Sequence, residues 1–408
     1  MVKASKVLGV LAIVGVIVIV GIVTSAGDAP GASPTGKRLE RIQTSAQWKG
    51  SSFDNRLERV DGSVGKMMRQ WIFGGSDYRL PDEPIVIVKT AAKLFETAPS
   101  SGLRVTWLGH STLLIEIDGS RLLVDPVWGE RTSPFTWMGP ERFFAPPLAL
   151  EDLPDLDGVI ISHDHYDHLD YPTVRRMRDL DVPWIVPLGV GAHLERWGLP
   201  RERIVELDWW ESTRVKDLTI TCTPARHFSG RAVLFTDQNA TLWAGWALNG
   251  PTHRVFYSGD TAMQDEFIEI GEKLGPFDLT LIESGAYNAL WADVHLGPEQ
   301  AVRAHQLVRG RVMLPVHWGL FNLALHGWTE PIERILAAAK LAGVKVVMPP
   351  PGGTVEPETA GEVTPWWPTR PWETGAAAPV QSSAVDHLMA DETLSKLKPI
   401  NTHESTDP

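Results

Sequence analysis

The sequence predicts an α/β fold in which two β-sheets pack face to face, with helices on their outer faces and a transmembrane helix at the N-terminus. Short β-branched runs of strand length recur from Leu103 onward and are bounded by turn residues such as Asp118-Gly119. Patterns with apolar residues three and four apart lie between the later runs. Strands in two groups with interleaved helices indicate a layered sandwich.

The N-terminus is directed to a membrane. From Val7 to Val23 every residue is apolar or Gly, with Lys3 and Lys6 before this run. Its length lies at the lower edge of the roughly 17–25 residues that span a bilayer and exceeds the roughly 7–15 of a signal-peptide core, so we expect an uncleaved anchor. Cleavage after Ala26 is the alternative. The lysines favour a cytoplasmic N-terminus, which places the catalytic domain on the periplasmic side of a bacterial membrane.

We divide the chain into four parts. Residues 1–26 are the membrane anchor or signal segment, 27–100 a linker and N-terminal extension, 101–356 the folded domain and 357–408 a disordered tail. The linker assignment rests on a Gly-, Pro-, Ser- and Ala-rich stretch from Gly27 to Gly36. The tail is rich in Pro, Thr, Ala and Glu and shows little periodicity.

The predicted elements of the domain are short. We expect strands at Val105–Leu108, Leu113–Ile117, Leu122–Val124, Gly158–Ile161, Leu218–Thr223, Thr241–Leu248, Val255–Ser258, Leu279–Ile282, Val312–Pro315 and Val344–Val347. We expect helices at Pro172–Leu180, Gln264–Leu274, Pro298–Val308 and Pro331–Leu341.

Composition limits the function. With 43% hydrophobic residues among 408, the chain can build a large core. A formal net charge of −12 argues against a nucleic-acid partner, because phosphate backbones recruit clustered Lys and Arg. Cys222, the only cysteine, lies in an apolar run, so we expect a buried thiol and no disulfide within the chain.

One loop concentrates metal-ligand side chains. His163, His165, Asp167 and His168 follow directly on a predicted buried strand. Imidazole nitrogens and carboxylates are ligands that zinc accepts, and this spacing lets one loop serve two ions. A solvated turn does not require such a density of His and Asp, so we interpret the segment as a metal-binding loop.

Isolated His and Asp residues follow three later strands, namely His227, Asp260 and His317. Any one of them alone is weak evidence for a metal site, because a histidine at a strand end more often donates to a backbone carbonyl than binds a metal. Their joint occurrence predicts a binuclear centre, in which two ions roughly 3.5–4 Å apart lower the pKa of a shared water and supply a bridging hydroxide. Asp125 also ends a strand, and we expect it either to orient a ligating imidazole or to be a plain turn residue.

The chain resembles the metallo-β-lactamase superfamily from about Trp107 to Leu341, and within it N-acyl-phosphatidylethanolamine phospholipase D and its bacterial relatives. The matching motifs are Thr106–Thr112, Gly139–Phe143, His163–Asp170, Glu206–Glu211, Ser258–Thr261, Gly275–Leu279 and His317–Gly319. The resemblance implies the αββα sandwich of that family and two Zn²⁺ ions, or other divalent metals.

The resemblance also implies a role for each ligand. One ion would be bound by His163, His165 and His227, and the other by Asp167, His168 and His317, with Asp260 bridging them. Asp167 and His295 are the catalytic candidates, and His295 would donate a proton or a hydrogen bond to a substrate phosphate. The stretch from Trp291 to His295 is shorter than in the animal phospholipase.

Two further groups are assigned to the pocket. His110 either borders the pocket or is a structural histidine. Trp128, Trp137 and Trp291 lie in predicted loops, where they are candidates for an apolar wall against acyl chains.

The leading functional hypothesis is a zinc-dependent phosphodiesterase of the phospholipase D type. Its substrate would be an N-acyl-phosphatidylethanolamine-like phospholipid or a small amphiphile, and its partner a membrane. A lactonase or other carbonyl-ester hydrolase is the second reading, because the same fold and ions also attack carbonyl carbon. A metal-binding envelope protein without turnover is the third, and it is disfavoured because no ligand of the set is missing. The sequence does not specify the oligomeric state.

Overall fold

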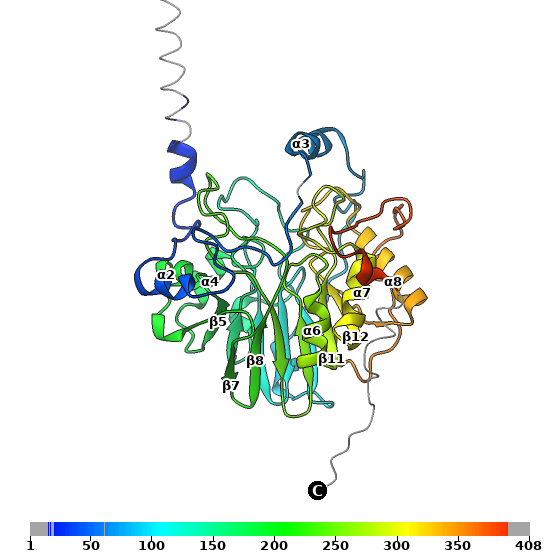
Figure 1. Ribbon diagram of the computed structural model, residues 1–408. Helices are drawn as coiled ribbons and strands as arrows, with labels where there is room; N and C mark the ends of the chain where they lie inside the picture. Colours follow the sequence, from blue (N-terminus) through cyan, green and yellow to red (C-terminus); the bar gives the residue numbers. More distant parts are fainter. Residues whose placement is uncertain (1–14, 16, 18–19, 61, 391–408) are drawn as a thin grey trace, which may run out of the picture.

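The computed structural model describes residues 15, 17, 20–60 and 62–390, and two mixed seven-stranded sheets form its centre (Figure 1). The first sheet has the order β14-β1-β2-β3-β4-β5-β6. Its strands are β1 (Leu103–Trp107), β2 (Leu113–Ile117), β3 (Ser120–Val124), β4 (Gly158–Ile160), β5 (Trp184–Pro187), β6 (Ile204–Leu207) and β14 (Thr354–Val355).

The second sheet has the order β13-β12-β11-β10-β9-β8-β7. Its strands are β7 (Ser212–Val215), β8 (Leu218–Thr223), β9 (Gly245–Asn249), β10 (Arg254–Tyr257), β11 (Phe277–Glu283), β12 (Gly310–Val316) and β13 (Lys345–Val346). Each sheet joins an antiparallel half to a parallel half, with β3 to β6 and β10 to β13 parallel. The predicted two-sheet sandwich is confirmed.

Helices cover the outer faces of both sheets (Figure 1). The helices are α2 (Gly36–Gln43), α3 (Val64–Phe73), α4 (Tyr171–Met177), α5 (Gly191–Arg196), α6 (Glu266–Lys273), α7 (Pro298–Leu307) and α8 (Glu330–Ala342). Strand residues alternate between two cores, as the pleat requires. In β2, Leu113 and Ile115 pack in the large core with residues of the second sheet, whereas Leu114 packs with Val174 of α4 and Leu194 of α5.

Part of the predicted linker, residues 28–32, packs against the domain. Trp197 Nε1 donates to Asp28 O at 2.7 Å, and the buried Arg231 donates to Ala29 O at 3.0 Å. Ala32 N donates to His193 Nδ1 at 3.1 Å. At Gly31, whose φ is +76°, a Cβ atom would lie 2.2 Å from His193 Nδ1, so the close approach requires glycine. Residues 28–32 therefore lie against the domain because buried side chains satisfy their backbone groups.

Most of the predicted anchor, residues 1–14, 16 and 18–19, lies outside the described residues. Residues 20–25 are helical. In the part of the chain that the structure describes, no helix has both the length and the apolar character needed to cross a membrane.

Truncation should separate the anchor from residues 28–32. A chain that begins at Gly27 should keep full thermal stability, because the hydrogen bonds of Asp28, Ala29 and Ala32 to Trp197, Arg231 and His193 remain. A chain that begins at Thr35 should lose about 1–3 kcal/mol of unfolding free energy, since Arg231 and His193 lose buried partners. Chemical denaturation of both chains measures the difference, and equal stabilities would show that these contacts are dispensable.

The structure differs from the disorder predicted for the tail over its described part, residues 357–390. Trp366 stacks on Trp318 with ring centroids 5.6 Å apart, and Trp367 Nε1 donates to Glu333 at 2.9 Å. Val385 and Leu388 are buried in the large core. Large apolar side chains hold this irregular segment on the domain, although it has little regular structure. Residues 391–408 lie outside the described residues.

Candidate metal centre

The predicted ligands converge because the strands that precede them run in the same direction. Asp125 follows β3 and the His-rich loop follows β4, and these two strands are parallel. In the other sheet, Asp260 follows β10 and His317 follows the parallel strand β12. The carboxyl ends of parallel strands meet at one edge of a sheet, so both sheets deliver polar side chains to the same end of the sandwich.

The first ligand group is made of three histidines, His163, His165 and His227. His163 Nε2 lies 2.9 Å from His165 Nδ1, and His227 Nε2 lies 3.2 Å from the same atom. All three ligand nitrogens lie within 4.8 Å of one another. This is the set that the sequence assigns to one ion.

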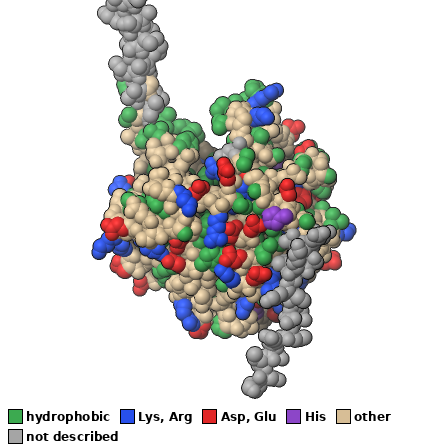
Figure 2. Space-filling view, viewed as in Figure 1, with side chains coloured by type: hydrophobic (Ala, Val, Ile, Leu, Met, Phe, Trp, Pro, Cys, Tyr) green, Lys and Arg blue, Asp and Glu red, His purple; other side chains and the backbone are tan. Residues whose placement is uncertain are grey.

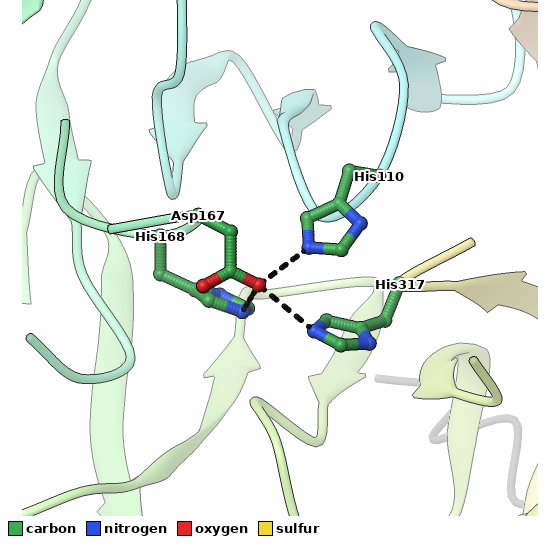
Figure 3. A group of neighbouring side chains, drawn as sticks. All are labelled: His110, Asp167, His168 and His317. Atoms are coloured by element: carbon green, nitrogen blue, oxygen red, sulfur yellow. Dashed lines mark hydrogen bonds and ion pairs between the residues drawn. The ribbon is translucent and has the colours of Figure 1, made fainter. Parts of the chain in front are cut away.

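The second group is centred on Asp167 (Figure 3). Asp167 Oδ2 lies 2.9 Å from His110 Nε2, 3.2 Å from His317 Nε2 and 3.3 Å from His168 Nε2. His168 and His317 are the partners assigned to the other ion. His110 joins them, fully buried, so the structure places it inside the cluster rather than at the border of a pocket.

Asp260 lies between the two groups. Its Oδ2 atom is 2.9 Å from His317 Nε2 and 3.2 Å from His168 Nε2 on one side. On the other side it is 3.8 Å from Nε2 of both His163 and His227. Its second oxygen, Oδ1, is buried without a hydrogen-bond partner among the described residues. This placement is the one that a bridging carboxylate requires.

Neighbouring groups fix the orientation of the rings. Asp125 Oδ2 accepts from His168 Nδ1 at 2.7 Å, and Asp125 is itself held by Ser162 and by the Tyr257 hydroxyl. On the other side, Val294 O accepts from His227 Nδ1 at 2.7 Å. Both rings are thereby turned so that Nε2 faces the centre.

Electrostatics makes the cluster receptive to cations. Burial lowers the pKa of His163 and of His227 well below the usual value, so both rings are neutral. Burial also acts to lower the pKa of His317, but the carboxylates of Asp260 and Asp167 outweigh it and raise that pKa to about 10. A proton and a metal ion therefore compete for the same nitrogen, and a bound cation would displace the proton.

The donor set fits two metal ions. It contains imidazoles and ionised carboxylates in two groups, and the Asp260 carboxylate lies between them. His168 Nε2 and Asp260 Oδ1 are buried without hydrogen-bond partners in the described part of the chain, which is costly unless another ligand satisfies them. His110, Asp125 and His317 adopt left-handed backbone angles, with φ of 53°, 41° and 65°, as is common for strained residues at functional sites.

A cavity of about 460 Å³ opens beside the ligands. Its lining includes the polar side chains of His165, Asp167, Asp260, His295 and His317. It also includes apolar side chains, namely Val64, Met67 and Trp71 of α3 with Phe228, Trp291 and Leu323. The sequence did not reveal the wall made by α3, because α3 is distant in the chain from every motif.

Of the three tryptophans proposed as an apolar wall, only Trp291 lines this cavity. Trp128 packs against the smaller core and donates to Leu148 O at 2.8 Å. Trp137 is 60% exposed and contacts Phe135. The expectation for Trp128 and Trp137 is therefore wrong, because both side chains are engaged elsewhere.

Sequence reasoning missed Glu283. It is the last residue of β11, it is fully buried, and its Oε1 atom lies 3.3 Å from His295 Nδ1. It ends a strand between β10 and β12, so the strand-end rule that identified Asp260 and His317 applies to it as well.

Comparison with known proteins agrees with this geometry. Residues 120–318 match the family model described as beta-lactamase superfamily domain. An uncharacterised protein of Mycobacterium tuberculosis is 51% identical over 288 residues, which cover 70% of this chain and 77% of that protein. The N-acyl-phosphatidylethanolamine-hydrolyzing phospholipase D 1 of Caenorhabditis elegans is 42% identical over 273 residues, or 64% and 76% of the two chains.

Among solved structures, a metallo hydrolase from the archaeon Ignicoccus hospitalis is similar, with a TM-score of 0.48 and 24% identity. The match covers 62% of this chain and 97% of that protein.

Proposed function

The chain belongs to the metallo-β-lactamase superfamily as a metal-dependent hydrolase similar to N-acyl-phosphatidylethanolamine phospholipase D, and we propose that it is a binuclear phosphodiesterase that cleaves lipids of this kind. The proposal goes beyond the family, because one fold supports many substrates.

The observation that carries the proposal is the mixed lining of the cavity. A phosphodiester lipid has a charged group next to long apolar chains, and the cavity is lined both by His165, Asp260 and His317 and by Met67 and Trp71. A phosphate bound at the ligand residues would leave its acyl chains to contact the apolar residues. A small polar lactone would leave these apolar residues uncovered.

The roles of the chain's residues follow from the geometry. His163, His165 and His227 would hold one ion, Asp167, His168 and His317 the other, and Asp260 both. Two bound ions, which we take to be Zn²⁺ from the histidine and carboxylate donors, would supply Lewis acidity and an activated water.

Three further residues complete the assignment. Asp125 keeps the His168 ring in place by accepting a hydrogen bond from its Nδ1. His110 holds Asp167 through the contact between its Nε2 and Asp167 Oδ2. His295 lies at the cavity with Nδ1 buried beside Glu283, so its Nε2 is the nitrogen left to donate a proton to the leaving oxygen.

Product analysis tests the proposal. Incubation with N-acyl-phosphatidylethanolamine in mixed micelles should yield phosphatidic acid and N-acylethanolamine, because attack at phosphorus expels the amide-bearing alcohol. A phospholipase C reaction would leave diacylglycerol, and an acyl hydrolase would release fatty acid. Turnover of lactones without cleavage of any phosphodiester would refute the assignment and favour the carbonyl hydrolase.

A membrane location is part of the proposal. Helix α3, which lines the cavity, exposes Met68, Ile72 and Phe73. It projects from the same end of the molecule as the N-terminal helical residues, and hydrophobic side chains gather over both (Figures 1 and 2). An anchor at that end would bring the cavity close to lipid.

Topology follows from the same anchor. With Lys3 and Lys6 on the cytoplasmic side, the catalytic domain would lie outside the cytoplasm. A reporter enzyme fused after Pro408 in a bacterial host should therefore be active only when it is of a type that works in the periplasm. Activity of a cytoplasmic reporter instead would reverse the orientation.

A further inference from the structure

Glu283 lies at the edge of the centre without an assigned role. It ends β11, the strand between those that lead to Asp260 and His317. Its side chain is 0% exposed, and Oε1 accepts from Leu296 N at 2.8 Å. The other oxygen, Oε2, has no hydrogen-bond partner among the described residues. A buried carboxylate oxygen left in this way costs free energy, so a further partner is expected.

The nearest polar group of matching chemistry is the His295 imidazole. His295 Nδ1 is 3.3 Å from Glu283 Oε1, and it too is buried without an aligned hydrogen bond in the described chain. A small rotation of either side chain joins the donor to the carboxylate. A buried imidazole nitrogen without a hydrogen-bond partner among the described residues, 3.3 Å from a buried carboxylate that has one oxygen still free to accept, indicates a pair.

Besides the bond from Leu296 N to Glu283, the loop that carries His295 is held in place by contacts that do not involve Glu283. The carboxylate of Asp293 accepts from Val60 N at 2.8 Å and from Ser383 N at 2.7 Å, and it pairs with Arg226 at 3.1 Å. Ser382 Oγ donates to Ala292 O at 2.6 Å. With the backbone fixed, the remaining freedom of His295 is the rotation of its ring, and Glu283 is the group placed to restrict it.

We propose that Glu283 is a positioning residue that accepts the Nδ1 proton of His295 and thereby presents Nε2 to the substrate. This inference rests on the proposed function. As the phosphorus–oxygen bond breaks, Nε2 of the imidazolium gives its proton to the leaving alcohol oxygen. The proton released by the attacking water then protonates Nε2 again. The Nδ1 proton stays between His295 and Glu283 throughout, and the carboxylate stabilises the imidazolium between turnovers.

A histidine spectrum tests the pair without any substrate. In the Zn²⁺-loaded full-length chain labelled with ¹⁵N-histidine, one Nδ1-bound proton should resonate far downfield and should disappear in His295→Gln. Glu283→Gln should move this resonance upfield, because a neutral amide is a weaker acceptor than a carboxylate. Glu116→Gln, at a buried glutamate in β2, is the matched control and should leave it unchanged. If the chemical shift of the His295 Nδ1-bound proton is the same in Glu283→Gln as in the wild type, the proposal is wrong.

A double-mutant cycle tests the role in turnover. Glu283→Gln retains the acceptor for Leu296 N, so the chain should fold, while kcat falls about 10–100-fold with KM and metal content unchanged. In the His295→Ala background the same change should have no further effect. Additive losses, or a lower metal content, would show that Glu283 supports the fold or binds metal instead. If the wild type cleaves only lactones, the proposed function fails, and the spectrum still decides whether Glu283 positions His295.

Discussion

Asp260→Ala is expected to remove both metal ions and to abolish hydrolysis. The wild-type chain should carry close to two ions, since the two ligand groups share only this carboxylate. In the variant, His168 and His317 lose the oxygen, Oδ2, that lies 3.2 and 2.9 Å from their Nε2 atoms. His163 and His227 lose the same oxygen, which lies 3.8 Å from each of their Nε2 atoms. Metal analysis by atomic emission, together with turnover, measures both losses.

Two variants make this expectation specific. Asp125→Ala removes a carboxylate that contacts the His168 ring at Nδ1 and not at Nε2, so activity should fall by about 10–100-fold, less than with Asp260→Ala. Asp278→Ala, at the end of β11 remote from the metal centre, should keep full metal content, because its carboxylate forms an ion pair with Arg311 at the surface. Chelation should abolish wild-type activity reversibly. Equal, mild effects of Asp260→Ala and Asp125→Ala would contradict the bridging role.

The ligands could be predicted because a metal ion accepts few types of side chain, and because parallel strands bring the residues at their carboxyl ends to one edge of the sheet. The order of strands need not be known for this, since each strand end is recognised locally, and His227, Asp260 and His317 each follow a predicted strand. The sequence left two interpretations of Asp125 open, because its role depends on the imidazole of His168, which lies more than 40 positions away in the chain. The structure places the two side chains 2.7 Å apart.

Other elements carried too weak a signal. Strand β7 (Ser212–Val215) is at a sheet edge with Ser212 and Arg214 exposed, so neither hydrophobic alternation nor β-branched density marks it. Strand β5 (Trp184–Pro187) is four residues long with proline at its end, which argues against a central strand on local grounds. Strand β5 forms because its neighbours bury all four of its residues, and β7 forms because it pairs with β8 along its whole length.

The apolar wall and the ordered tail were missed for a different reason. Trp71 of α3 lines the same cavity as the ligands although the two segments are far apart in sequence, and Trp366 stacks on Trp318, which is likewise distant in the chain. Composition predicts disorder when a segment has few groups to bury. It does not show that a few tryptophans can hold such a segment on the domain when another part of the chain offers a surface for them.

His295→Ala is expected to lower the turnover of a lipid phosphodiester by about 10²–10⁴-fold, the scale of general acid–base assistance, while two ions stay bound. The side chain is 13% exposed and lines the cavity, with its ring centroid 5.1 Å from that of His227 and 5.2 Å from that of His317. It is close enough to reach a group held at the ligands. Steady-state kinetics and metal analysis on the same preparation measure both quantities.

Leaving-group chemistry separates proton donation from other roles of His295. An alkoxide leaving group needs a proton as its bond breaks, whereas p-nitrophenolate leaves without one. His295→Ala should therefore slow an alkyl phosphodiester far more than a p-nitrophenyl phosphodiester, because only the first transition state uses the Nε2 proton. His326→Ala is the matched control, since that ring stacks on Tyr287 and belongs to none of the ligand groups, so its loss should affect both substrates alike. Equal losses on the two substrates together with a fall in bound metal would identify His295 as a ligand, since its nitrogen lies within 4.8 Å of the ligand atoms of His227 and Asp260. A large difference between the substrates at unchanged metal content is the result that proton donation requires.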